Sequence, residues 1–332
     1  MNNPKQLNYV DQLCLFKLRG ISGIDLQIVD EKDSDAGRHK REEHQRKLHT
    51  VKMVGYYELK RYAYPFWDSV EKKYTNLSFS DLVARYYRDK KLRQNVLHAI
   101  EDIEIALNAQ IAYVLGNKYG PLGYLDFSKW CQRDSRNEYL NNKYMNKFAI
   151  SEERLKFLTK LQYKIKKSSM VDVRNYLDSS GKIFPPVWIM INVLTLGDSI
   201  HILKLMSKSS RREIASVFGC KTKELINWME CLNLIRNICC HNGNLIDFKL
   251  KTTPVIPSEY QDSLYCYHSS RRLIYTNRIA VVICIILKLM KAINSKYQFH
   301  RLRNSITSFA NDDAAANIYG FKDKAELEKL FL

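Results

Sequence analysis

Apolar residues recur three and four positions apart along most of the chain, which is the spacing of one face of an α-helix. The clearest stretch ends near Gly116 or Gly120, where Pro121 follows as a helix stop. Its apolar positions are Leu92, Val96, Ile100, Ile103, Leu107, Ile111 and Val114. The pattern predicts one long helix over residues 90–117, preceded by a shorter helix.

The same spacing predicts helices over residues 151–167, 210–220 and 222–243, and a short final helix near the C-terminus. Gly243 is expected to end the third of these. In the stretch 185–206, Gly197 and Asp198 either divide the run into two helices or mark a close helix crossing. Because no stretch has a convincing strand pattern, the expected fold class is all-α, with the helices packed as a bundle.

Charge and helix patterning together predict three segments. Residues 1–52 form an N-terminal charged extension, dense in charge after Asp30. Residues 53–250 form a helical core, and residues 251–332 form a basic helical part that packs on this core. The apolar run Ile279–Met290 contains Lys288 and is shorter than the ~20 residues of a membrane span. It therefore predicts a buried helix and no membrane association.

The formal net charge is +18, from 53 Lys and Arg against 35 Asp and Glu among 332 residues. Such an excess attracts polyanions, with nucleic acid as the first candidate and an anionic membrane surface as the second. A protein that is simply basic is the remaining explanation.

The local charge pattern favours RNA, because no acidic residue occurs between Asp262 and Asp312. A lysine stripe on the helix 151–167 adds to this surface, although such stripes are usually only solvated. The residues expected to contact RNA phosphates are Arg271, Arg272, Arg278, Lys291, Lys296, Arg301, Arg303, Lys160 and Lys164.

The eight cysteines form no C-x-x-C pair, and the N-terminus lacks the apolar core of a signal peptide. Both features favour a cytoplasmic protein with reduced thiols. Cys239, Cys240 and His241 are adjacent on a predicted helix, so they cannot converge on one tetrahedral zinc ion. We therefore expect no metal and no cofactor.

The segment "LIRNICCHNGNL", residues 234–245, places three polar side chains near the end of an otherwise apolar helix. Asn237 and His241 lie one turn apart, about 40° around the helix, whereas Arg236 lies about 140° from His241. Cleavage of a phosphodiester by its own 2′-hydroxyl needs a cation for the phosphorane and a group that moves protons near neutral pH. Arginine and histidine supply these, and an amide can hold the phosphate. The simpler interpretation is that these three residues cap the helix and supply polar side chains at the surface, because R-x4-H alone is a weak pattern.

Several stretches occur in an order that resembles the abortive-infection proteins of the AbiD/AbiF type, which are similar to HEPN-fold ribonucleases. These stretches are "VGYYELKRYAYPF", "LRQNVLHAIEDIEIALNAQIAYVL", "YGPLGYLD", "FPPVWIMINVLTLGDSIHILKLM", "RREIASVFG" and "LINWMECLNLIRNICCHNGNL". The resemblance covers roughly residues 47–250.

This resemblance implies a bacterial antiphage protein with a HEPN-like core and metal-independent endoribonuclease activity. Two protomers of such proteins usually bring their R-x4-H motifs together, so a homodimer is expected. Arg236, Asn237 and His241 match the motif, and Glu104 matches an acidic helix position that pairs with Arg236 or is structural. The chain departs from the family pattern at Cys240 before the histidine and at "NGNLIDF" after it.

Three functions stay open at this stage. The first is an RNA-cleaving, toxin-like effector that uses Arg236, Asn237 and His241. The second is a non-catalytic RNA-binding protein that forms a complex with a small structured RNA. The third is a structural partner that dimerises through the helix carrying Arg236.

Overall fold

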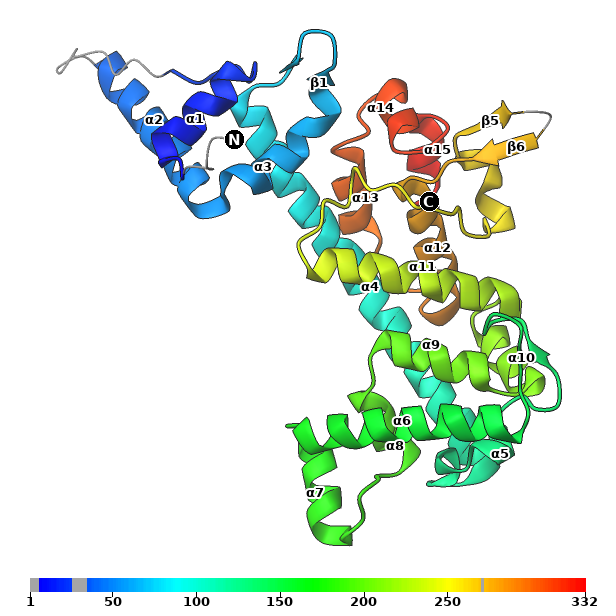
Figure 1. The fold of residues 1–332 in the computed structure, drawn as a ribbon. Helices are drawn as coiled ribbons and strands as arrows, with labels where there is room; N and C mark the ends of the chain where they lie inside the picture. The colour runs from blue at the N-terminus through cyan, green and yellow to red at the C-terminus, as the bar shows by residue number, and fades with distance from the viewer. Residues whose placement is uncertain (1–5, 26–34, 270–271) are drawn as a thin grey trace. The chain divides into compact units, whose positions relative to one another are not determined.

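The computed structural model describes residues 6–25, 35–269 and 272–332. Helices dominate, which confirms the all-α fold class (Figure 1). The chain divides into two compact units, residues 1–93 with 242–248, and residues 94–241 with 249–332. These units divide the chain at residues different from the segment boundaries expected at 52 and 250.

The first unit begins with helices that enclose a small apolar core. Leu13 and Phe16 of α1 pack with Val51 of α2 and with Leu59 and Tyr62 of α3, and all five are fully buried. Gly20 allows the chain after α1 to pass close to β2, because a Cβ atom there would lie 2.4 Å from the Tyr74 carbonyl oxygen. The elements are α1 (Tyr9–Leu18), α2 (Asp35–Val54), α3 (Tyr56–Ala63), η1 (Tyr64–Phe66), β1 (Trp67–Asp68), β2 (Lys73–Tyr74) and the beginning of α4 (Phe79–Tyr119).

A buried carboxylate attaches residues 242–248 to the remainder of the first unit. Asp89 of α4 accepts hydrogen bonds from the Tyr62 hydroxyl and the Ile246 amide, both at 2.8 Å, and forms an ion pair with Arg93 at 3.2 Å. Burial raises the pKa of Asp89 and outweighs these partners, which lower it. Because an unpaired buried charge is strongly destabilising, these contacts fix the segment to α4.

The second unit contains the long apolar helix expected at residues 279–290, now α12, of which only Lys288 and the end of the helix are not buried. Figure 1 shows α11, α9 and α6 one below another, with α4 behind them. The elements after α4 are η2 (Gly123–Leu125), α5 (Phe127–Trp130), β3 (Arg136–Asn137), β4 (Lys143–Tyr144), α6 (Lys147–Lys167), α7 (Val171–Ser180), α8 (Val187–Met190), η3 (Ile191–Val193), α9 (Leu196–Leu205), α10 (Lys208–Val217), α11 (Thr222–Cys240), η4 (Ser258–Ser263), β5 (Cys266–Ser269), β6 (Arg272–Tyr275), α12 (Ile279–Ile293), α13 (His300–Thr307), α14 (Asp313–Ile318) and α15 (Lys324–Lys329).

Three local expectations were wrong. The region before residue 90 is part of α4 and not a separate helix, because neither glycine nor proline interrupts the sequence there. The strand pairs β1–β2, β3–β4 and β5–β6 form hairpins, although the sequence showed no strand pattern. Asn242 and not Gly243 adopts the left-handed conformation after α11, with φ of 55°. Asparagine tolerates this conformation better than most residues.

The run divides into two helical parts, as one interpretation of the sequence expected, but it does so at Leu194 and Thr195, and Gly197 lies in the first turn of α9. Thr195 and Asp198 form a capping box that begins α9. A Cβ atom at Gly197 would lie 3.5 Å from the Asn233 amide of α11. In the described part of the chain, no helix is long and apolar enough to cross a membrane.

Candidate active site at the end of helix α11

Helix α11 is held in place by the apolar face that its sequence predicted. The helix is also fixed to the following loop, because the Trp228 indole donates to the Val255 carbonyl at 2.6 Å and the Val255 amide donates to the Asn227 side chain at 2.7 Å. The buried residues of the predicted face are Leu225, Trp228, Met229, Leu232, Ile235 and Cys239. The helix end that carries the polar motif is therefore positioned by packing along its length.

The motif residues lie where α11 meets solvent. Arg236 is half-buried, whereas Asn237 and His241 are exposed. His241 caps the helix, and its backbone amide donates to the Asn237 carbonyl at 3.0 Å, so the one-turn separation of these two residues is preserved. The exposed Asn237 and His241 side chains leave the end of α11 open to a large ligand.

Glu104 of α4 is the acidic residue that the structure associates with Arg236. Burial raises the pKa of this half-buried carboxyl, and the nearby charge of Arg236 opposes that shift. The backbone amide of Leu196, in the first turn of α9, also donates to it. This carboxylate of α4 thus accepts from α9 and lies near enough to Arg236 of α11 for the two charges to interact, and a perturbed pKa near a cation is typical of functional sites.

Two polar contacts beside this carboxylate were not predicted from the sequence. The Ser199 hydroxyl of α9 donates to the Asn108 side chain of α4 at 2.5 Å. Asn233 of α11 packs against Gly197. The available signal was spacing, because Asn108 lies one turn after Glu104, and Asn233 lies one turn before Asn237.

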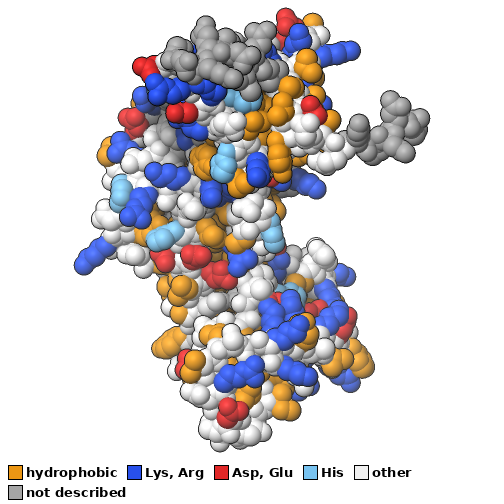
Figure 2. Space-filling view, turned by 90° about the vertical axis from the view of Figure 1, so that its left-hand side faces the viewer, with side chains coloured by type: hydrophobic (Ala, Val, Ile, Leu, Met, Phe, Trp, Pro, Cys, Tyr) orange, Lys and Arg blue, Asp and Glu red, His pale blue; other side chains and the backbone are white. Residues whose placement is uncertain are grey.

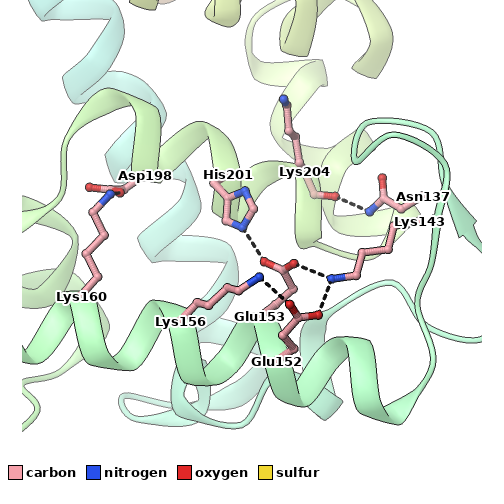
Figure 3. Close-up of polar contacts among 9 residues, drawn as sticks. All are labelled: Asn137, Lys143, Glu152, Glu153, Lys156, Lys160, Asp198, His201 and Lys204. Carbon is pink, nitrogen blue, oxygen red and sulfur yellow. Dashed lines mark hydrogen bonds and ion pairs between the residues drawn. The ribbon is translucent and has the colours of Figure 1, made fainter.

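The two lysines of α6 that are expected to bind RNA also form contacts within the protein. Lys160 and Lys164 both donate to Asp198 of α9, each at 2.5 Å. Figure 3 shows Lys160 reaching Asp198. Burial raises the pKa of Asp198, but the hydrogen bonds from these lysines and from Thr195 outweigh it and keep the pKa below its ordinary value. Part of the lysine charge is therefore compensated, and RNA contact by these two residues stays a prediction.

Two of the other residues that are expected to contact RNA line the same cavity. Lys296 and Arg301 line a polar cavity of about 580 Å³ together with His98 and Asp102 of α4. Lys291 lies over the Tyr260 ring, 5.7 Å from its centroid. The other described arginines that are expected to contact RNA do not line this cavity. Arg272 is exposed on β6, Arg278 precedes α12, and Arg303 is half-buried on α13.

Arg271 lies outside the described residues. On the face drawn in Figure 2, lysine and arginine side chains are widespread, with a group in the lower half of the view. This distribution agrees with a protein that carries a large positive charge.

The motif cysteines differ in exposure, since Cys239 is buried and Cys240 is exposed. Within the described ranges, no group of three or more His, Cys, Asp or Glu residues is arranged to hold a metal ion. Arg236, Asn237, His241 and Glu104 remain the residues through which this site is expected to act.

Comparison with known proteins gives one match. A family model described as "Abi-like protein" matches residues 49–247, which is more than half of the chain and includes Glu104 and the whole R-x4-H motif. No curated protein and no solved structure gives a significant match.

The charge coupling between Glu104 and Arg236 can be measured directly. We expect Arg236→Ala to raise the pKa of Glu104 further, because the cation that favours its ionised form is removed. Carboxyl-carbon NMR titration of the Glu104 side chain measures this shift. Arg212→Ala, at an exposed arginine of α10, is the matched control. An unchanged Glu104 pKa in Arg236→Ala would show that the two groups are not coupled.

Proposed function

The chain belongs to the Abi-like protein family, which indicates a role in abortive infection as a defence against phage, and we propose that it is a metal-independent endoribonuclease. The observation that carries this proposal is the interaction between the charges of Arg236 and the half-buried Glu104 of α4. Arg236 lies on α11, the helix that the exposed His241 caps. A guanidinium held beside an accessible imidazole is the minimum needed to cleave RNA through its 2′-hydroxyl.

The proposed reaction is a transesterification within the RNA. The 2′-oxygen bonds to the adjacent phosphorus as it loses its proton, and the bond from phosphorus to the 5′-oxygen breaks as that oxygen gains a proton. His241 moves the proton, Arg236 stabilises the negative charge that develops on the phosphorane, and Asn237 donates its amide to a phosphate oxygen. The products are a 2′,3′-cyclic phosphate and a 5′-hydroxyl.

Glu104 acts in this proposal as a positioning residue. Its carboxylate receives the Leu196 amide and lies in the field of Arg236. We propose that this attraction restrains the long arginine side chain. An arginine held in this way loses less conformational freedom when it binds a phosphate.

The polar cavity on α4 is proposed as a second place where RNA phosphates bind. His98 and Asp102 of this cavity lie about 120° and 160° around the helix from Glu104, so the cavity is on another side of α4. Lys296 and Arg301 in the same cavity are suited to contact RNA phosphates away from the one that is cleaved.

A homodimer is proposed to complete the site. Leu234, Asn237, Ile238 and His241 follow the three- and four-residue spacing of one helix face. Leu234 is 44% exposed, and Ile238 is only half-buried, so this face carries apolar residues that a second copy would cover. Two such faces in contact would place two motifs beside one RNA strand.

Non-catalytic RNA binding is the second candidate, and the compensation of Arg236 by Glu104 favours it. A guanidinium whose charge is already partly balanced can hold a phosphate without stabilising a phosphorane. In that case the protein would form a stable complex with a small structured RNA.

Loss of cleavage in motif variants tests the nuclease. We expect Arg236→Ala and His241→Ala each to reduce RNA cleavage by at least about 100-fold, because each removes stabilisation of the transition state. The assay uses purified protein, labelled RNA and EDTA, with Arg212→Ala and His39→Ala as controls at exposed positions. Intact RNA binding without cleavage by the wild type would instead support the second candidate.

The dimer has its own test. We expect Leu234→Glu to shift the protein from dimer to monomer and to reduce cleavage in parallel, since it places a charge in the proposed contact. Light scattering after size-exclusion chromatography gives the mass of each variant. Leu155→Glu, at a leucine of α6 that is 70% exposed, is expected to stay dimeric. A monomeric wild type that cleaves RNA would contradict the shared site.

A further inference from the structure

A cavity in the second unit is lined by residues that lie far along the sequence from the motif of α11. It has a volume of about 800 Å³ and is lined by residues 119–134 and by the first turns of α6. Cavities of about 300–1,000 Å³ are typical of small-molecule sites. This cavity includes most of the stretch "YGPLGYLD", which the proposed nuclease does not use.

The wall of the cavity depends on two glycines in that stretch. Gly120 ends α4 with φ of +79°, a conformation that L-residues rarely adopt. A Cβ atom at Gly123 would lie 2.4 Å from the Cβ atom of Tyr119, so any larger residue would displace the tyrosine that lines the cavity. The stretch is therefore built to turn tightly and to keep Tyr119 in place.

The interior is apolar and partly aromatic. Phe127 is fully buried, and Ile150 is 6% exposed. Pro121, Leu122 and Leu125 complete the apolar lining beside Tyr119. A planar, weakly polar group fits such a surface.

The rim is positively charged. Arg133, Lys147 and Arg154 line the cavity, and no ion pair joins any of the three to a carboxylate within the described residues. Arg154 is held in position by its Nε, which donates to the Leu125 carbonyl at 2.7 Å. The first turn of α6 contains no acidic residue, so the positive end of the helix adds to this field.

The lining has two carboxylates against its four basic side chains, which are Lys129, Arg133, Lys147 and Arg154. Asp126 caps α5 and pairs with Lys129 at 3.5 Å, and the exposed Asp134 is the other acid on the lining. Glu152 accepts hydrogen bonds from Lys143 and Lys156, which lower its pKa to about 2 (Figure 3). The lining therefore has an excess of positive charge.

We propose that this cavity binds a nucleotide, with its base against Tyr119, Pro121 and Leu122 and its phosphate at Arg133 and Lys147. Arginine and lysine beside a helix N-terminus suit phosphate, and the apolar wall suits a base. The nucleotide is either a free mononucleotide or the phosphorylated end of an RNA. This site is independent of the nuclease proposal, because it uses none of its residues.

Binding of AMP to the full chain, measured by isothermal titration calorimetry, tests the site. We expect Arg133→Glu and Lys147→Glu each to weaken AMP binding at least tenfold, and the matched Arg212→Glu to leave it unchanged. Ser151→Trp, which fills the cavity from α6 without removing a charge, is expected to weaken it as well. Thermal unfolding of each variant separates loss of binding from loss of folding.

Three comparisons decide the nature of the ligand. Adenosine and inorganic phosphate should each bind at least tenfold more weakly than AMP, because each has only half of the recognised chemistry. If a 5′-phosphorylated RNA competes with AMP and the same RNA with a 5′-hydroxyl does not, the ligand is the phosphorylated end of an RNA. If neither RNA competes with AMP, the ligand is a free nucleotide. No AMP binding at millimolar concentration, or equal binding by phosphate alone, would overturn the proposal.

Discussion

A half-buried carboxylate is the constraint on which the candidate active site depends. Glu104 lies between three helices, and a charge in that position is stable only if partners compensate for lost hydration. The Leu196 amide and Arg236 supply this compensation from α9 and α11. The same carboxylate therefore also lies in the field of the half-buried Arg236, on the helix that ends at the exposed His241.

The basic side chains of the second unit have different surroundings: some form ion pairs within the protein, and others line cavities. Lys160 and Lys164 are bound to Asp198 and so serve mainly to join α6 to α9. Lys296 and Arg301 line a polar cavity, and Arg133 and Lys147 line a second, more apolar one. The net charge of +18 thus combines internal ion pairs with separate surfaces that are open to anions.

Periodicity was sufficient to predict α11, its buried face and the buried helix α12, because local spacing determines which side of a helix is apolar. The motif residues stood out in the sequence because they interrupt an apolar pattern, and their role stays a prediction. The ion pairs of Lys160 and Lys164 could not be predicted, because their partner Asp198 is 38 and 34 residues away. The hairpins were missed because strands of two to four residues are too short to show alternation.

The chemistry of the cleaved ends tests the central claim most directly. The wild-type protein should cleave RNA in the presence of EDTA and leave a 2′,3′-cyclic phosphate on one fragment and a 5′-hydroxyl on the other. Mass spectrometry of the fragments distinguishes these ends. Fragments with a 3′-hydroxyl and a 5′-phosphate, or cleavage that EDTA abolishes, would contradict the account.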